Sequence, residues 1–253
     1  MDSIMKKLDY TSAPQIASYK SAECREYLRS VSSYSCTYCT ISESEAPGAT
    51  FHIDHFRPRA NFPQYENTAN NLRYSCPRCN LIKGKHWIKS TDGCIRNCEE
   101  CKTNICHENI FRFVDSLTEN PNDHLILQDD YKLEAINGSK PAIHTIKYLR
   151  LNRAQLIKLR RTRRFILLWK KELEERKESA EEKILFIKSE REKFERVLRS
   201  DVPNNDNQQL LDVITILFDM LSEQANYSKS IIENELEKVE KLLAIRSGAD
   251  HLF

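Results

Sequence analysis

Two Cys-x-x-Cys pairs constrain the fold of this chain more than any other feature of its sequence. They are Cys36 with Cys39 and Cys76 with Cys79. One such turn can direct two thiolates at a metal ion, and two turns complete the tetrahedral ligand set that structural zinc prefers. We therefore expect a closed Zn²⁺ site that ties distant segments together. A redox pair is the alternative, but the βαβ context that it needs is missing around both pairs.

The cysteines are confined to the front of the chain. All nine of the 253-residue sequence lie between Cys24 and Cys106. No apolar run reaches the length of a membrane span or a signal peptide, so we expect a cytoplasmic protein with reduced, metal-binding thiols. With only 5 glycines there is no Gly-rich loop for a phosphate, and the net charge of +2 does not by itself indicate a nucleic-acid ligand.

A second group of cysteines follows the first. It consists of Cys94, Cys98, Cys101 and Cys106. The spacing is irregular, but the density suggests a second structural zinc site, with His107 as an alternative ligand. Reduced surface thiols on a loop are the competing interpretation.

The segment between the two pairs carries candidate catalytic groups. Apolar and polar residues alternate from Phe51 to Asp54, which predicts a half-buried strand with His52 and Asp54 on one face. A carboxylate beside an imidazole suits phosphodiester hydrolysis, since Asp54 can hold a divalent cation and His55 can deprotonate water near neutral pH. An ordinary surface pair is the alternative.

A short helix is expected to begin at the second cysteine pair. The zinc site would then join strand, loop and helix, and would bring Asp54, His55 and Asn80 into one cleft. For Asn80 a helix cap is the competing role, and for Asn71 a plain turn residue.

Residues 36–86 resemble the HNH nuclease family, whose ββα-metal centre has the same order of motifs: CTYC, IDHF, NL and CPRCNLIKG. The resemblance implies that His55 is the general base and Asp54 a metal ligand. It also implies that Asn71 holds the loop and orients the base, and that Asn80 is the second protein ligand of the catalytic metal. Two oxygen ligands favour Mg²⁺ or Mn²⁺.

Basic residues surround these motifs and form a candidate phosphate-binding surface. Solvated side chains without a ligand are the alternative. The residues expected to contact nucleic acid are His52, Arg57, Arg59, Lys83 and Lys85, with Arg73, Arg78 and His86 nearby.

Over about residues 15–165 the sequence is similar to the HNH nuclease subunit (PtuB) of Septu-type anti-phage defence systems, which also occurs beside some retron reverse transcriptases. This similarity implies an ABC-type ATPase partner (PtuA-like), and in some systems a reverse transcriptase with its nucleic acid. The chain has no ATP-binding loop of its own.

The expected fold class is α+β, mainly α, with a nuclease domain at 1–145 and a helical domain at 146–253. Polar loops and apolar periodicity place the helices and one hairpin. We expect helices at 14–33, 152–177, 179–200, 208–223 and 228–246, and a hairpin arm at 131–136 before Asn137-Gly138. The long helices could form a self-contained bundle or dock a partner. The basic residues from Arg153 to Lys171 could contact nucleic acid, or pair with acidic groups.

Three functional classes remain. A nuclease is the first, a zinc-stabilised binding module without catalysis the second, and a zinc-dependent redox or regulatory adaptor the third. An inactive descendant of a nuclease should have lost Asp54, His55 or Asn80, and all three are present.

Overall fold

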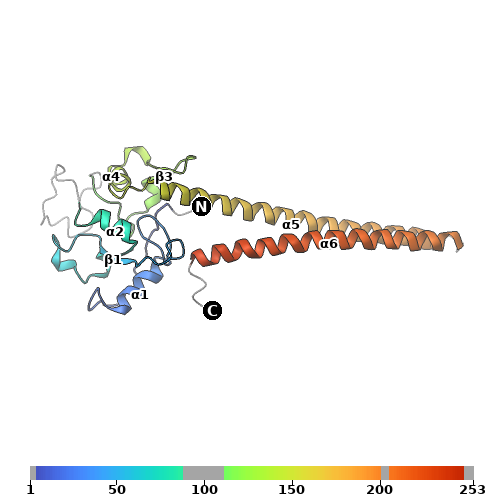
Figure 1. The fold of residues 1–253 in the computed structure, drawn as a ribbon, viewed down its shortest axis with the longest axis horizontal. Coiled ribbons are helices and arrows are strands. Elements are labelled where there is room, and N and C mark those ends of the chain that lie inside the picture. The colour runs from blue at the N-terminus through green and yellow to red at the C-terminus, as the bar shows by residue number, and fades with distance from the viewer. Residues whose placement is uncertain (1–3, 88–110, 201–204, 248–253) are drawn as a thin grey trace. The chain divides into compact units, whose positions relative to one another are not determined.

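The computed structural model describes residues 4–87, 111–200 and 205–247 (Figure 1). They divide into two compact units, Met1–Arg164 with Ala244–Phe253, and Phe165–Leu243. The mainly helical α+β class expected from the sequence is confirmed. No helix of the described ranges is both long and apolar enough to cross a membrane. The second cysteine group, Cys94 to Cys106, lies outside the described residues.

A small antiparallel hairpin and one helix form the centre of the first unit. Strand β1 (His52–His55) pairs with β2 (Leu72–Ser75), with His52 opposite Ser75 and His55 opposite Leu72. Helix α2 (Pro77–Lys83) follows at once, because Pro77 lacks the N–H that a first helical turn leaves unpaired. It ends at Gly84, whose φ of 49° is left-handed.

The leading helix is shorter than predicted. Helix α1 spans Ala22–Val31, and the Ser21 side chain caps it by accepting a hydrogen bond from the Cys24 N–H. The expected start at 14 is wrong, because the preceding segment makes tertiary contacts instead. The Tyr19 N–H, for example, donates to Asn67 Oδ1 at 2.9 Å.

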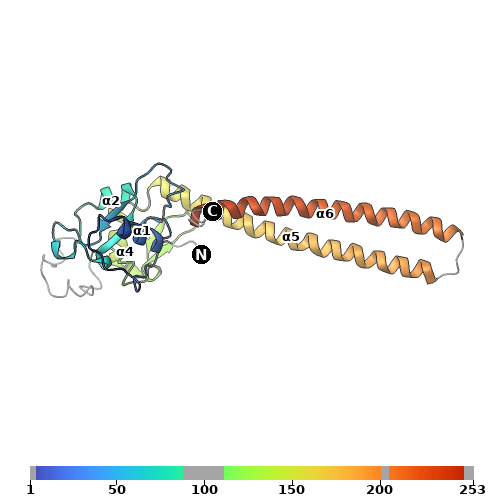
Figure 2. The same cartoon turned by 90° about the horizontal axis from the view of Figure 1, so that it is seen from below.

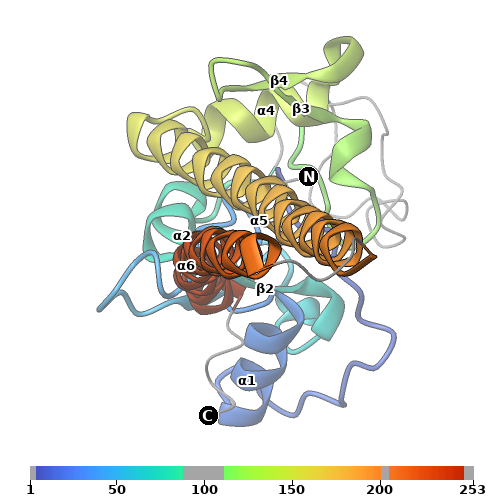
Figure 3. The same ribbon diagram turned by 90° about the vertical axis from the view of Figure 1, so that its right-hand side faces the viewer.

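The second hairpin has a different turn from the one predicted. Strand β3 (Leu125–Leu127) pairs with β4 (Leu133–Ala135) across a turn that contains Tyr131 at a φ of 64°. The Asn137-Gly138 pair lies after β4 and leads into α4 (Lys140–Tyr148), which packs beside the hairpin (Figure 3). The expected arm is therefore the second strand of a hairpin and not the first.

The core of the first unit combines apolar side chains with a buried ion pair. Phe51, Leu72 and Phe113 are among the fully buried residues. Arg73 is completely buried beside them and donates to Asp115 Oδ1 at 2.6 Å. Since Arg73 needs this partner, its expected place on a phosphate-binding surface is wrong.

The second unit is a hairpin of two long helices that run side by side in opposite directions (Figure 2). Helix α5 (Ala154–Ser200) begins in the first unit, and α6 is Asn205–Ser247. Four helices were predicted here, and the breaks expected at 178 and 224–227 are wrong. Neither region contains Gly or Pro, and ion pairs such as Lys177–Glu233 and Lys229–Glu181 connect the helices there.

Candidate active site and zinc centre

The four paired cysteines lie together in the interior of the first unit. The Sγ atoms of Cys36, Cys39, Cys76 and Cys79 all lie within 4.8 Å of one another. Cys39 Sγ and Cys76 Sγ are 3.7 Å apart. Tetrahedral zinc with Zn–S bonds of about 2.3 Å would separate two sulfurs by about 3.8 Å. The predicted clustering is confirmed, and its geometry fits a zinc ion.

Local structure positions these thiolates. The Thr37 N–H donates to the Tyr74 carbonyl, which fixes the first cysteine turn against β2. Cys76 caps α2 and places Cys79 one turn into the helix. Arg153 Nη2 lies 3.9 Å from Cys79 Sγ, where its positive charge would offset the net negative charge of four thiolates on one Zn²⁺.

Basic residues near the start of α5 form hydrogen bonds with other segments of the first unit. Arg163 is buried and donates to the Thr40 carbonyl at 2.7 Å and to Glu45 Oε1 at 2.8 Å. Arg160 donates to the carbonyls of Tyr131 and Leu151. Pairing with an acidic group, one of the alternatives for these basic residues, is therefore found at Arg163, whereas Arg160 bonds to backbone carbonyls.

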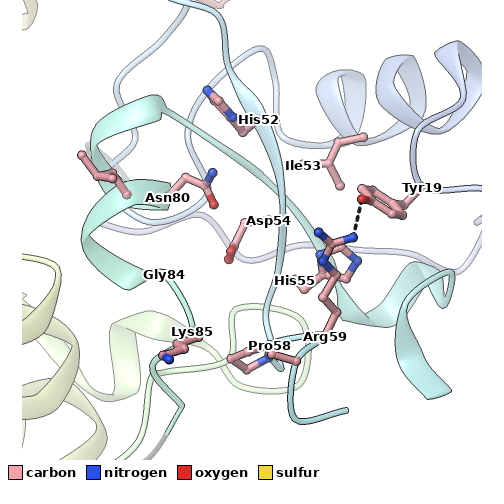
Figure 4. Close-up of a pocket in the computed structure, with 12 residues that line it drawn as sticks. Tyr19, His52, Ile53, Asp54, His55, Pro58, Arg59, Asn80, Gly84 and Lys85 are labelled. Atoms are coloured by element: carbon pink, nitrogen blue, oxygen red, sulfur yellow. Dashed lines mark hydrogen bonds between the residues drawn. The ribbon is translucent and has the colours of Figure 1, made fainter. Parts of the chain in front are cut away.

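A cavity of about 560 Å³ opens between β1, the loop after it and α2 (Figure 4). It collects residues from three segments distant in sequence. Its lining includes Tyr19, His52, Asp54, His55, Arg59, Asn80 and Lys85. The cleft expected from the sequence thus contains Asp54, His55 and Asn80 together.

Asp54 is held by two buried neighbours. Lys83 Nζ lies 3.0 Å from Oδ2 and 3.2 Å from Oδ1, and also donates to the His55 carbonyl at 2.6 Å. The Tyr38 hydroxyl donates to Oδ2. Burial lowers the pKa of Lys83, while the Asp54 charge acts in the opposite direction. Sequence reasoning missed this network, because nothing in the spacing relates Tyr38 to Asp54.

His55 is oriented by a backbone carbonyl. Its Nε2 lies 2.9 Å from the Glu66 carbonyl oxygen, which can only accept, so Nε2 carries the proton. Burial lowers the pKa of His55, although the bond to Glu66 and the charge of Asp54 partly oppose this. The lowered pKa favours the neutral ring, and the bond from Nε2 to Glu66 leaves its lone pair on Nδ1. Tyr19 packs edge-on against it at 4.7 Å between ring centroids.

Asn71 lies outside the cavity lining and holds the loop that forms one wall of the cavity. It is buried; its Oδ1 accepts from the Arg57 N–H at 2.8 Å, and its Nδ2 donates to the Arg57 carbonyl at 3.0 Å. A further bond reaches the Tyr65 carbonyl at 3.2 Å. The side chain thus fixes the backbone immediately after β1, next to His55.

Asn80 projects from α2 toward the Asp54 carboxylate (Figure 4). Its amide makes no hydrogen bond with any residue that the structure describes, so its oxygen is available as a ligand. A carboxylate has about four lone-pair positions, and the bonds from Lys83 and Tyr38 leave capacity on Asp54. One carboxylate and one amide oxygen facing a polar cavity fit a hard divalent cation such as Mg²⁺ or Mn²⁺.

The comparison with known families agrees with this geometry. Residues 36–86 match the model of the HNH endonuclease family. The matched segment is an HNH domain; it begins at the first zinc-site cysteine and includes β1, β2 and α2. No curated protein and no solved structure matches the chain.

The basic residues predicted around the HNH motifs separate into two groups. His52, Arg59 and Lys85 are exposed at the cavity, where Arg59 Nη1 donates to the Tyr19 hydroxyl at 2.9 Å (Figure 4). Arg57 and Lys83 are buried, and their expected place on a phosphate-binding surface is wrong. Lys83 is occupied by Asp54, and the Arg57 guanidinium packs over the rings of Tyr65 and Trp87.

Proposed function

We propose that this chain is a metal-dependent endonuclease that hydrolyses phosphodiester bonds in nucleic acid, with the HNH domain as its catalytic part. The observation that carries the proposal is the convergence of His55, Asp54 and Asn80 on one cavity. The family match to residues 36–86 supports the same reaction class.

His55 is the general base in this proposal. Because Nε2 donates to the Glu66 carbonyl, Nδ1 is the atom that accepts the proton of the attacking water. Asn71 keeps the adjoining loop in place through its bonds to the Arg57 backbone. Asn71 is a positioning residue in this proposal, because it lies outside the cavity lining.

Asp54 and Asn80 would hold the catalytic metal. A bound Mg²⁺ or Mn²⁺ would supply positive charge for the scissile phosphate and the leaving oxygen. Lys83 and Tyr38 fix the orientation of the Asp54 carboxylate. The exposed His52, Arg59 and Lys85 guide the phosphate backbone to the centre.

A binding module without catalysis is the second candidate, and the ion pair between Lys83 and Asp54 favours it. An ammonium group within 3.0 Å already neutralises the carboxylate that would bind the metal. In that case zinc would stabilise the domain, and the exposed basic residues would bind nucleic acid without cutting it.

We further propose a biological setting: the effector of an anti-phage defence complex, in which an ABC-type ATPase gates cleavage. A retron reverse transcriptase and its nucleic acid are further partners in this setting. The support is the sequence similarity over about residues 15–165 and the lack of an ATP-binding loop in the chain.

The decisive experiment is cleavage of plasmid DNA and total RNA with Mg²⁺ or Mn²⁺, with and without the ATPase partner. We expect His55→Ala to lower the rate by roughly 10²–10⁴-fold, the range for a lost general base. His124→Ala is the matched control, because His124 bonds to Ser139 outside the cavity. Equal cutting by wild type and His55→Ala would remove His55 from the mechanism. Nucleic-acid binding without cleavage under every condition would favour the binding module.

A further inference from the structure

Helix α6 carries a second apolar stripe that α5 does not cover. Its members follow the three-and-four spacing of a coiled-coil seam, and each is 47–68% exposed. They are Leu210, Val213, Leu217, Met220, Tyr227 and Ile231. Gln224 occupies the one position of the repeat that is not apolar.

This stripe is separate from the seam inside the hairpin. The intramolecular seam buries Ile232, Leu236 and Val239 of α6 against Leu173 of α5. Ile231 and Ile232 are successive residues, so the two stripes face directions about 100° apart around the helix. Because a helix pair has one shared seam, α5 leaves the second stripe exposed to solvent.

The stripe has the extent that a stable interface needs. Ile216 and Leu221 flank it and are 59% and 46% exposed, which brings the number of large exposed apolar side chains to eight. At on the order of 100 Å² each, they present about the 800 Å² per partner of a standard interface. An apolar patch of this size on a soluble surface marks an interaction site.

The positions beside the stripe indicate which partner fits. In coiled coils, charges at the flanking positions select between partners. The flanking positions here are Ile214, Ile216, Leu221, Glu223, Ser228 and Ser230. Only Glu223 is charged, so two identical helices meet with little repulsion, and no charge pattern selects a different chain.

We propose that α6 pairs with α6 of a second copy of this chain, parallel and in register over residues 210–231. Gln224 decides the direction. In an antiparallel pair its amide faces an apolar residue of the other helix and loses its hydrogen bonds. In the parallel pair it faces Gln224 of the second copy, and the two amides bond to each other.

Sedimentation equilibrium of the full chain with zinc and reductant tests the pairing. We expect twice the chain mass at micromolar concentration. Met220→Glu places two carboxylates in the seam and should raise the dimer dissociation constant roughly 100-fold or more. Asn226→Glu is the matched control, because residue 226 is exposed on α6 outside the stripe and its flanks. A monomeric wild type, or equal weakening by both variants, would overturn the proposal.

Disulfide trapping tests the direction. A Leu217→Cys variant in mild oxidant should give a covalent dimer, since facing positions of a parallel pair lie within disulfide range. Wild type and Asn226→Cys, treated alike, report any linkage through the native cysteines. Mixing the Leu217→Cys and Tyr227→Cys variants tests the opposite direction. A disulfide that forms only in this mixture would show antiparallel pairing and overturn the parallel register.

Discussion

The first unit buries some of its ion pairs, whereas the ion pairs described in the helical hairpin all lie at the surface. In the first unit, Arg73 and Lys83 are buried, and each is held by one aspartate. In the hairpin, pairs such as Arg191–Asp219 lie on the surface, and water screens them. Buried pairs demand fixed partners, whereas surface pairs tolerate rearrangement.

The two units also differ in what holds them together. The first unit has a continuous apolar core and a cluster of four cysteines that fits zinc, while the hairpin has one cluster of four buried apolar residues, with Ile187 and Ala225 buried outside it. The roles proposed for Asp54 and Asn80 require fixed positions, and the core of the first unit provides that rigidity. The hairpin is mostly exposed surface, and such a surface requires less rigidity.

The largest expected effect is the loss of the zinc site. Cys76→Ser removes one thiolate, and since structural zinc contributes apparent binding energies of roughly 10–16 kcal/mol, the first unit should unfold. Bound zinc and near-UV circular dichroism should both fall, while much of the far-UV helical signal of the hairpin stays. A folded, zinc-free variant would show that the thiolates hold no structural metal.

The next effect separates a buried ion pair from an exposed one. Asp115→Ala leaves Arg73 charged and without its carboxylate, so unfolding free energy should drop by about 3–5 kcal/mol in chemical denaturation. Asp219→Ala removes the partner of Arg191 in the hairpin and should leave the midpoint unchanged. A similar loss of unfolding free energy in both variants would show that the buried and the exposed ion pair contribute equally to stability.

The smallest effect lies in the hairpin seam. Leu173 is buried against Ile232, Leu236 and Val239, and Leu173→Ala should cost about 2 kcal/mol, the low end for leucine, because so thin a seam can collapse. Thermal melting followed at 222 nm should show an earlier hairpin transition with zinc content unchanged. Simultaneous loss of zinc would mean that the two units unfold as one.

The sequence predicted the parts of the site that depend on local spacing. Paired cysteines, the strand around Asp54 and the helix after Cys76 each follow from short-range patterns, and the structure has all three. The clustered cysteine pairs, β1 and α2 together place Asp54, His55 and Asn80 at one cavity.

Contacts between distant segments were beyond prediction. Lys83 was expected at the surface because lysine is usually solvated, yet its burial depends on Asp54, which lies in another element. Tyr19 fell within the helix predicted at 14–33, but it lies before α1 and packs against His55 at the cavity. The long helices were divided in two because charge patterns do not show where a partner helix supports the chain.

The bonds between Arg163 and the Thr40–Glu45 segment have a consequence for biosynthesis. All four zinc ligands have left the ribosome well before Arg163 is made. At about 5–20 residues per second, the delay is on the order of several seconds. During that interval a nascent chain can capture zinc while Glu45 still lacks its arginine. Metal binding by the four thiolates can therefore precede the bonds that Arg163 makes to Thr40 and Glu45.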